Sequence, residues 1–284
     1  VMIVPKMISN IGPAHIAIIL DLQGPCYSVV TACASGTDAI GRAASWIQDG
    51  TVDMMITGGA EAPITEIALG GFCAIQALST KYNDTPEKAS RPFDKNRDGF
   101  VLGEGAGLVV LEELEHAKKR GAQIYGEFAS AGMTCDANHM TAPHPEGRGA
   151  IQAIRMALRK AGMEPDDIDY INAHGTSTPM NDPIETKAIK DVFGNHAYNL
   201  KVSSTKSMTA HLIGGAGGVE AIACLMAIKE QFFPPTINFE EPDPECDLDY
   251  IPNKGVSGNI QAAMSNSLGF GGHNGIIIFK KFEE

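Results

Sequence analysis

Segments typical of strands alternate with segments typical of helices along most of this chain, and this alternation limits the possible folds most strongly. Apolar runs that predict strands cover residues 26–31, 52–62, 107–114, 168–176 and 275–281. Apolar side chains at helical spacing predict helices over 35–48, 148–162 and 217–231. Strands that alternate with helices form a sheet buried between helices, so the pattern predicts an α/β fold. We expect strand 52–62 to be buried.

The composition excludes several classes of protein. The chain has 284 residues, of which 44% are hydrophobic, enough for one large domain or two packed halves. A net charge of -12 argues against nucleic acid as a partner. We see no membrane span and no signal peptide, and six cysteines without CxxC spacing predict reduced thiols with no metal site. Together these features predict a cytoplasmic protein.

The sequence contains a weak internal repeat. Residues 27–50 and 202–231 share one plan: a strand of small residues, a short polar loop, and a helix that opens with glycine and an acidic residue before Ala-Ile. A repeated plan of this kind predicts two similar halves. We place the boundary between residues 122 and 123, so that the halves are 1–122 and 123–284.

Cys33 lies between the predicted strand 26–31 and the predicted helix 35–48. A lone cysteine is more often a packed core residue. The N-terminus of a helix favours an anion, however, and therefore favours the thiolate. The small neighbours Ala32, Ala34 and Gly36 also leave room for a substrate. The position therefore points to a nucleophile, which needs a base or a cation nearby.

Two histidines could supply that partner. His174 follows the predicted strand 168–176 at its carboxyl end, where ligand sites of α/β sheets lie. His211 lies in the loop that repeats the plan of the Cys33 loop. Either histidine alone would more often be structural, but their placement in a repeat that also holds Cys33 favours a shared site.

Three glycine-rich stretches have different interpretations. Neither GEGAG (103–107) nor GGAGG (214–218) fits a nucleotide-binding loop, because the required spacing or the following lysine is missing. NSLGFGGHNG (266–275) is either a tight turn or a backbone whose N–H groups form an oxyanion hole.

Five motifs together resemble the β-ketoacyl-acyl carrier protein synthases of type II fatty acid synthesis, most closely the synthase II group. They are TACASGTDAIG (31–41), RPFDKNRDGFVLGEGAG (91–107), NAHGTSTPMNDPIE (172–185), SSTKSMTAHLIGGAGGVEA (203–221) and NSLGFGGHN (266–274). The resemblance implies the thiolase fold, with two pseudo-repeated α/β halves in αβαβα layers. It also implies that the family's N-terminal segment, which would precede Val1, is absent here.

The resemblance assigns a role to each candidate catalytic residue. Cys33 would accept the acyl chain as a thioester, and His174 with His211 would bind the malonyl thioester and support its decarboxylation. Lys206 would lie behind His211 with Glu220 as its partner. The N–H groups of Cys33 and Phe270 would form the oxyanion hole, and Phe270 would gate the acyl pocket. The implied substrate-binding residues are Thr176, Thr178, Phe72, His139 and Gly271, with the two threonines on the phosphopantetheine arm.

The resemblance also implies partners. The substrates would be acyl- and malonyl-acyl carrier protein, whose phosphopantetheine carries the acyl groups, and no cofactor or metal would be needed. The enzyme would be a homodimer. Two alternatives remain open: a polyketide ketosynthase, and a truncated, non-catalytic subunit that binds acyl chains or another protein. A thiolase is less consistent, since Cys246 lies in an acidic, proline-rich stretch.

Overall fold

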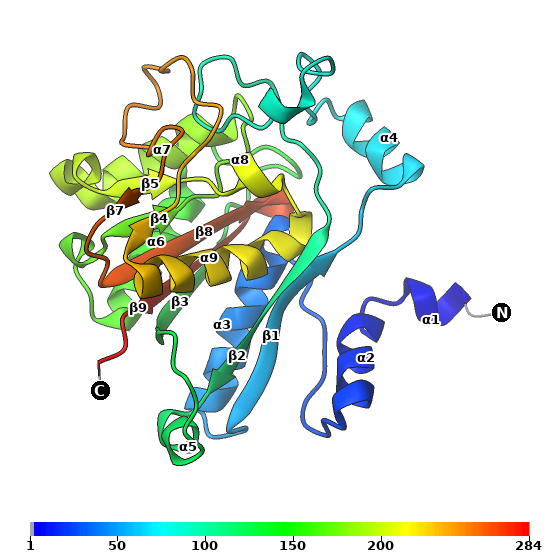
Figure 1. The fold of residues 1–284 in the computed structure, drawn as a ribbon. Helices are drawn as coiled ribbons and strands as arrows, with labels where there is room; N and C mark the ends of the chain where they lie inside the picture. The colour runs from blue at the N-terminus through cyan, green and yellow to red at the C-terminus, as the bar shows by residue number, and fades with distance from the viewer. Residues whose placement is uncertain (1–2, 284) are drawn as a thin grey trace.

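The computed structural model describes residues 3–283 and is built around a five-stranded mixed sheet (Figure 1). Its order is β3 (Glu127–Cys135), β9 (His273–Lys280), β8 (Ala262–Gly269), β4 (Tyr170–Asn172) and β5 (Lys201–Ser203). Strands β3, β9 and β8 are antiparallel neighbours, whereas β8, β4 and β5 run parallel. Strands β4 and β5 run parallel and end at the same edge of the sheet, and the segments that carry His174 and His211 follow them.

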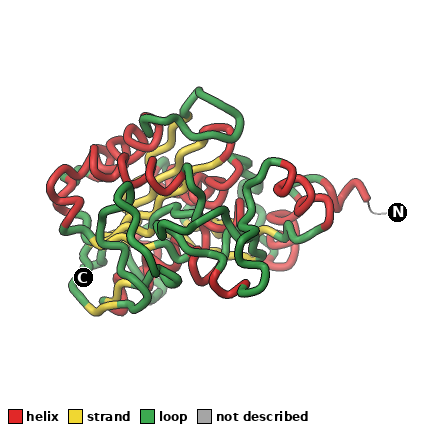
Figure 2. Tube along the Cα trace, turned by 90° about the horizontal axis from the view of Figure 1, so that it is seen from above, coloured by secondary structure: helices red, strands yellow, loops and turns green. Residues whose placement is uncertain are grey.

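Helices pack on both faces of this sheet. The pair α6 (Arg148–Ala161) and α7 (Asn181–Phe193) lies on one face, and the pair α3 (Ser35–Gln48) and α9 (Ala216–Glu230) lies on the other (Figure 2). Successive side chains of a strand point to opposite faces. In β9, Ile276 and Ile278 accordingly join the core under α6, while Ile277 and Phe279 join the core under α9. The predicted α/β class is confirmed.

A second, smaller sheet lies against the outer side of α3 and α9. It is an antiparallel pair of strands, β1 (Met54–Glu61) and β2 (Gly105–Glu112). The predicted strand 52–62 is therefore present, but the expectation that it is buried is wrong. A two-stranded sheet with helices on one face exposes its other face, and only Thr57 of β1 is buried. These elements form four of the five layers of the implied αβαβα arrangement, in the order α, β, α, β.

The remaining elements are short or peripheral. They are α1 (Ile3–Met7), α2 (Ile11–Leu20), α4 (Glu66–Ala74), α5 (Leu114–Lys119), α8 (Lys206–Thr209), β6 (Phe232–Phe233) and β7 (Val256–Ser257). Helix α2 buries none of its residues, and with α1 it stands to one side of the other elements in Figure 1. No helix within residues 3–283 is both long and apolar enough to cross a membrane.

The three predicted helices are confirmed, but the predicted strand 26–31 is wrong. These residues run without a partner strand among residues 3–283. In the C-terminal half, β4 joins β5 to β8. No described strand joins 26–31 to β1 in the same way, and an apolar run forms a strand only when a neighbour accepts its backbone hydrogen bonds.

Glycines bring the two halves close together. A Cβ on Gly36 of α3 would lie 2.9 Å from Gly218 N and 3.0 Å from Gly214 O. A Cβ on Gly107 of β2 would lie 2.3 Å from Val219 N. Since real Cβ atoms do not approach backbone so closely, these positions need glycine. The GGAGG and GEGAG stretches thus serve packing, which brings the loops before α3 and α9 together.

Candidate active site

Three predicted residues meet in one buried cluster. The Sγ atom of Cys33 and one ring nitrogen each of His174 and His211 all lie within 4.8 Å of one another. The two imidazole rings are 5.3 Å apart between centroids and stand edge to face. The nucleophile therefore comes from the first half of the chain and both histidines from the second.

A strained turn presents Cys33. The residue lies in a single 3-10 turn, Ala32–Ala34, directly before α3. Ala32 has φ 51°, in the left-handed region that residues other than glycine rarely adopt. The Ser35 hydroxyl holds this turn, since it accepts from Thr31 N at 2.9 Å and donates to Ala32 O at 2.7 Å. The turn directs Cys33 inward, toward the histidines.

The backbone of His211 is fixed from the first half of the chain. His211 N donates to Val101 O at 2.8 Å, and Gly103 N donates to His211 O at 2.9 Å. The ring of Phe100 packs edge to face against the imidazole of His211, with 5.2 Å between centroids. The segment that follows the RPFDKNRDG motif is therefore one wall of the site.

A carboxylate that the sequence analysis missed fixes His174. Glu185 of α7 is fully buried, and its two oxygens accept from His174 N and Gly175 N, each at 2.8 Å. The side chain of Asn266 also donates to Glu185, at 3.2 Å. Glu185 ends the NAHGTSTPMNDPIE motif, but the motif gave no sign that this carboxylate turns back onto the loop.

Behind the cluster lies the predicted pair of Lys206 and Glu220. The Lys206 ammonium donates to Glu220 Oε1, and both side chains are buried. The pKa values of His174 and His211 lie well below the usual value, mainly because burial disfavours the charged ring, and the nearby Lys206 charge lowers both further. Both imidazoles are consequently neutral at neutral pH and able to accept a proton.

The ionisation expected for Cys33 is wrong in sign. Burial raises the pKa of its thiol from 9.0 to about 11. Hydrogen bonds from the N–H groups of Phe270 and of Cys33 itself, and the charge of Lys206, lower the pKa but do not offset burial. Since the turn before α3 is enclosed, the loss of water outweighs these three contributions. The resting site pairs a neutral thiol with neutral imidazoles.

Comparison with known proteins assigns the family. The family model for the N-terminal domain of β-ketoacyl synthases matches residues 1–117, and the model for their C-terminal domain matches residues 125–240. The chain belongs to the β-ketoacyl synthase family. The resemblance seen in the motifs is thereby confirmed. The predicted boundary between residues 122 and 123 falls in the gap between the two matched ranges.

Individual relatives agree with this assignment. The synthase is 57% identical over 280 residues to 3-oxoacyl-[acyl-carrier-protein] synthase 2 of Synechocystis sp., and 55% identical to the protein of the same name in Staphylococcus aureus. Each match covers 99% of this chain and 67% of the relative. A solved chain from a type II polyketide acyl-carrier protein–ketosynthase complex superposes with a TM-score of 0.96 at 39% identity, covering 98% of this chain and 68% of the other. The predicted thiolase fold is confirmed.

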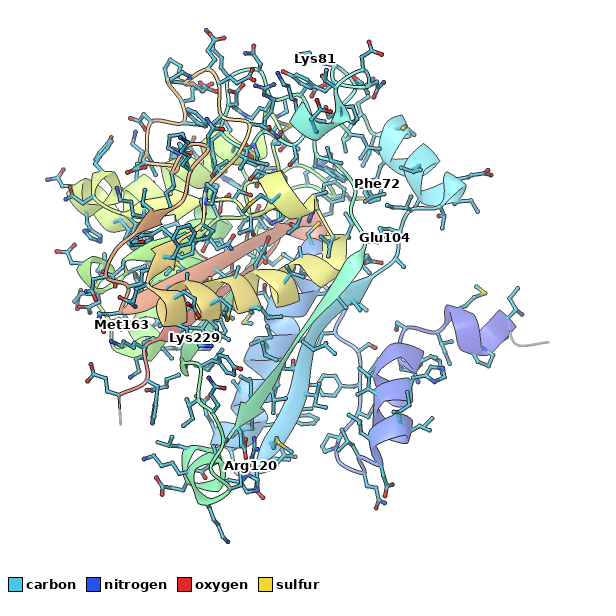
Figure 3. The ribbon with its side chains drawn as sticks, in the orientation of Figure 1. Phe72, Lys81, Glu104, Arg120, Met163 and Lys229 are labelled. Carbon is cyan, nitrogen blue, oxygen red and sulfur yellow. The ribbon has the colours of Figure 1, made fainter. Side chains whose placement is uncertain are left out.

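The predicted substrate-binding residues of the synthase lie at different distances from the cluster. Thr176 and Thr178 follow His174 on its loop, and their hydroxyls are 3.1 Å apart. Phe72 of α4 (Figure 3) is half-buried and packs edge to face on Phe100, the residue that contacts His211. These contacts place both threonines and Phe72 around the site, whereas their roles stay predictions.

Two further predicted residues lie on loops. Gly271 has φ 82° in the turn after β8, and its N–H donates to Met140 O at 2.7 Å. His139 is exposed, and its Nδ1 accepts from Thr141 N and Ala142 N at 3.2 Å. The His139 ring thus caps its own loop, which reaches the site through Met140 and Gly271.

Cysteine and imidazole are also ligand types of metal sites. Cys33, His174 and His211 offer one ligand atom each at a spacing that could hold an ion. The absence of a catalytic metal therefore stays a prediction for the synthase.

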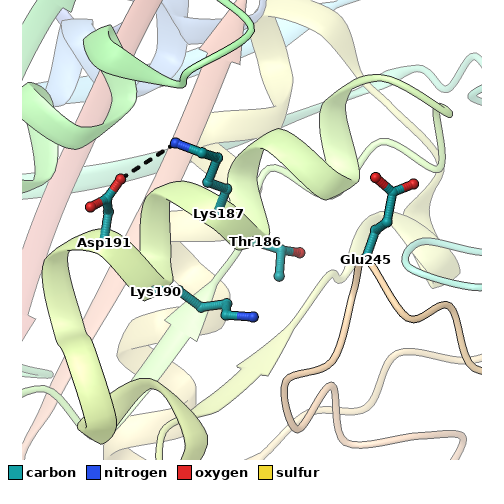
Figure 4. A pocket seen from close by; sticks show the side chains of 5 residues that line it. All are labelled: Thr186, Lys187, Lys190, Asp191 and Glu245. Carbon is teal, nitrogen blue, oxygen red and sulfur yellow. Dashed lines mark ion pairs between the residues drawn. The ribbon is translucent and has the colours of Figure 1, made fainter.

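A hollow on the outer side of α7 is unrelated to this chemistry (Figure 4). It is lined by Thr186, Lys187, Lys190, Asp191 and Glu245. Its lysines are paired, since Lys187 contacts Glu146 and Asp191 while Lys190 contacts Asp247. Its lining contains no cysteine or histidine, so the candidate site remains the cluster around Cys33.

Proposed function

We propose that this chain is a 3-oxoacyl-acyl carrier protein synthase, an acyltransferase of fatty acid synthesis. It joins an acyl chain held on Cys33 to malonyl-acyl carrier protein, with loss of CO₂. The observation that carries this proposal is the Cys33, His174 and His211 cluster, in which the reacting atoms lie within 4.8 Å. The names of the relatives from Synechocystis and Staphylococcus support it.

The first step is acyl transfer. The Cys33 thiol gives its proton to a neighbouring neutral imidazole as its sulfur attacks the thioester carbonyl. The N–H groups of Cys33 and Phe270, which already face the sulfur, stabilise the oxygen anion that forms. The carbon–sulfur bond to the carrier then breaks, and the departing pantetheine sulfur takes the proton from the imidazole. Cys33 is left as a thioester.

The second step is decarboxylative condensation. The bond between the malonyl methylene and its carboxylate breaks, CO₂ leaves, and the electron pair forms an enolate on the thioester. Ring N–H groups of His174 and His211 donate to the enolate oxygen. The enolate carbon attacks the acyl carbonyl on Cys33, and the carbon–sulfur bond to Cys33 breaks. The released thiolate takes one proton from solvent, because its pKa of about 11 favours the thiol.

The substrates reach Cys33 on the phosphopantetheine arm of an acyl carrier protein. In this proposal Thr176 and Thr178 hydrogen-bond the arm, while Phe72, His139 and Gly271 line its route. The solved complex of a related ketosynthase with its acyl-carrier protein supports such a partner. The reaction needs no cofactor, since loss of CO₂ drives it. We further propose a cytoplasmic homodimer, which analytical ultracentrifugation would test.

A polyketide ketosynthase is the second candidate, favoured by the TM-score of 0.96 to the ketosynthase complex. Sequence identity favours the fatty acid reading, at 57% against 39%. A non-catalytic role is disfavoured because Cys33, His174, Lys206 and His211 are all in place. Mass spectrometry of the product distinguishes the two candidates. A product extended by one malonyl unit indicates fatty acid synthesis, whereas an unreduced poly-β-keto chain indicates polyketide synthesis.

The Cys33→Ala variant tests the proposal. It loses the thiol but keeps both histidines, so we expect 3-oxoacyl product to fall about a thousandfold or more while malonyl-acyl carrier protein still loses CO₂. Radiolabelled CO₂ release and product mass spectrometry measure the two steps separately. Cys26→Ala, at an exposed cysteine, is the matched control and keeps both. Undiminished condensation by Cys33→Ala would refute the assignment.

A further inference from the structure

Two arginines of the RPFDKNRDG motif are buried, and the reaction described above does not use them. Arg91 is 1% exposed and Arg97 is 7% exposed. Arg91 directs its side chain away from the site, donating to Asp94 at 3.1 Å and Glu240 at 2.9 Å. A buried guanidinium loses its hydration, so protein groups must replace water as its hydrogen-bond partners. The identity of those partners indicates the role of the arginine.

The side chain of Arg97 contacts the loop that follows His174. Its Nε donates to the main-chain oxygen of Thr178 at 3.1 Å. Its Nη1 donates to Asp94 O at 2.9 Å and to Asp243 Oδ2 at 2.6 Å, and its Nε lies 3.8 Å from Asp182. One planar guanidinium therefore ties the Thr178 peptide to two other segments in a fixed orientation.

The loop that receives this contact is strained. Ser177 is fully buried and has φ 68°, a left-handed conformation unusual for serine. Main-chain groups of the arginine segment hold it, since Arg91 N donates to Ser177 Oγ at 3.1 Å and Gly99 N donates to Ser177 O at 3.0 Å. Ser177 separates Thr176 from Thr178, whose hydroxyls are 3.1 Å apart. Arg97 fixes the carboxyl side of this strained residue.

We propose that Arg97 is a positioning residue for the substrate arm. By holding the Thr178 carbonyl it fixes the peptide between Thr178 and Pro179, and thereby the direction of the Thr176 and Thr178 hydroxyls. The inference rests on the proposed function, in which those hydroxyls meet phosphopantetheine. Lysine at position 97 keeps the positive charge but not the planar fork, so it cannot reach Thr178 O and Asp243 together.

Loss of the Arg97 contact should impair only substrates that carry the pantetheine arm. In Arg97→Lys we expect the KM for a medium-chain acyl-pantetheine to rise about tenfold, since a charge-assisted hydrogen bond is lost, with kcat changed less than about twofold. The matching S-ethyl thioester has no pantetheine amides, and its rate of transfer to Cys33 stays unchanged. A purely structural role would lower both rates together.

Arg91→Lys is the matched control. Arg91 is as deeply buried, lies in the same motif and forms similar ion pairs, but its side-chain hydrogen bonds in the described residues go to Asp94 and Glu240 and not to the 176–178 loop. We expect its ratio of acyl-pantetheine to S-ethyl thioester rates to equal that of the unaltered chain. The same loss of ratio in both variants would overturn the proposal.

A coupling measurement completes the test. If Arg97 acts through Thr178, the KM increase of Arg97→Lys becomes smaller in a Thr178→Val background, in which only the Thr176 hydroxyl remains to be positioned. Additive effects would overturn the proposal. Should Arg97→Lys fail to fold, Asp243→Asn removes the ionic partner instead, and a smaller loss of the same ratio is expected; an unchanged ratio contradicts the proposal. If the unaltered chain transfers acyl groups from neither donor, the proposed function fails instead.

Discussion

The ionisation of Cys33 gives the most informative prediction. Its pKa rises from 9.0 to about 11 because burial disfavours the thiolate. At pH 7 the ionised fraction is then about 0.01%, against about 1% for an ordinary cysteine, a difference of about a hundredfold. A neutral electrophile such as iodoacetamide reacts with the thiolate, so its rate with Cys33 reports this fraction.

The assay is alkylation of the folded chain from pH 6 to pH 10, with each cysteine followed by peptide mass spectrometry. Limited access to a buried thiol lowers the rate equally at every pH, so the shape of the curve is the readout. We expect the Cys33 rate to rise about tenfold per pH unit up to pH 10 without levelling. The same peptide in urea provides the control and should level near pH 9.

A plateau at pH 7 to 8 in the folded chain would refute this reasoning. It would mean that the helix N-terminus, the N–H groups and Lys206 outweigh burial, and that the thiolate is the resting nucleophile. The proposed proton transfer from Cys33 to an imidazole would then be unnecessary. The curve without a plateau supports a neutral thiol that ionises only as it attacks.

The remaining predictions concern the groups around Cys33. The folded-state pKa values of His174 and His211 lie below the unfolded value of 6.5, so their contribution to stability is full above pH 6.5 and is lost as pH falls. Below pH 6.5 the two histidines together contribute up to about 2.7 kcal/mol per pH unit to the pH dependence of the unfolding free energy. Urea unfolding of His174→Asn/His211→Asn should therefore show a flatter pH dependence. An unaltered slope would contradict this. Glu220→Gln leaves the buried Lys206 ammonium without its counter-charge and should cost about 3–5 kcal/mol of unfolding free energy. Lys206→Met/Glu220→Gln should recover at least half of that loss in the same assay, and a double variant no more stable than Glu220→Gln would show that the pair is not coupled.

Local sequence signals were sufficient for the helices. The apolar spacing of 35–48 and the glycine at 162 act within a few residues, and the structure has α3 over Ser35–Gln48 and the end of α6 at Gly162, with φ 65°. The motifs likewise brought Cys33, His174 and His211 together correctly. Helix formation and motif identity depend on residues close together in the sequence, so the sequence alone is enough to predict them.

Features that depend on distant neighbours could not be predicted in this way. Residues 26–31 have the composition of a strand but lack a partner among the described strands. The sequence shows that Cys33 precedes a helix but not that it is buried, so it could not predict the raised pKa of the thiol. Glu185 and Arg97 act on the His174 loop from other segments, and only the folded chain shows those contacts.

The central claim is that Cys33 carries the acyl chain during the reaction. The most direct measurement is peptide mass spectrometry after the chain is mixed with a medium-chain acyl-acyl carrier protein. The account predicts one acyl adduct, on the peptide that contains Cys33, which disappears when malonyl-acyl carrier protein is added. An adduct on another residue, or 3-oxoacyl product formed while Cys33 stays unmodified, would contradict it.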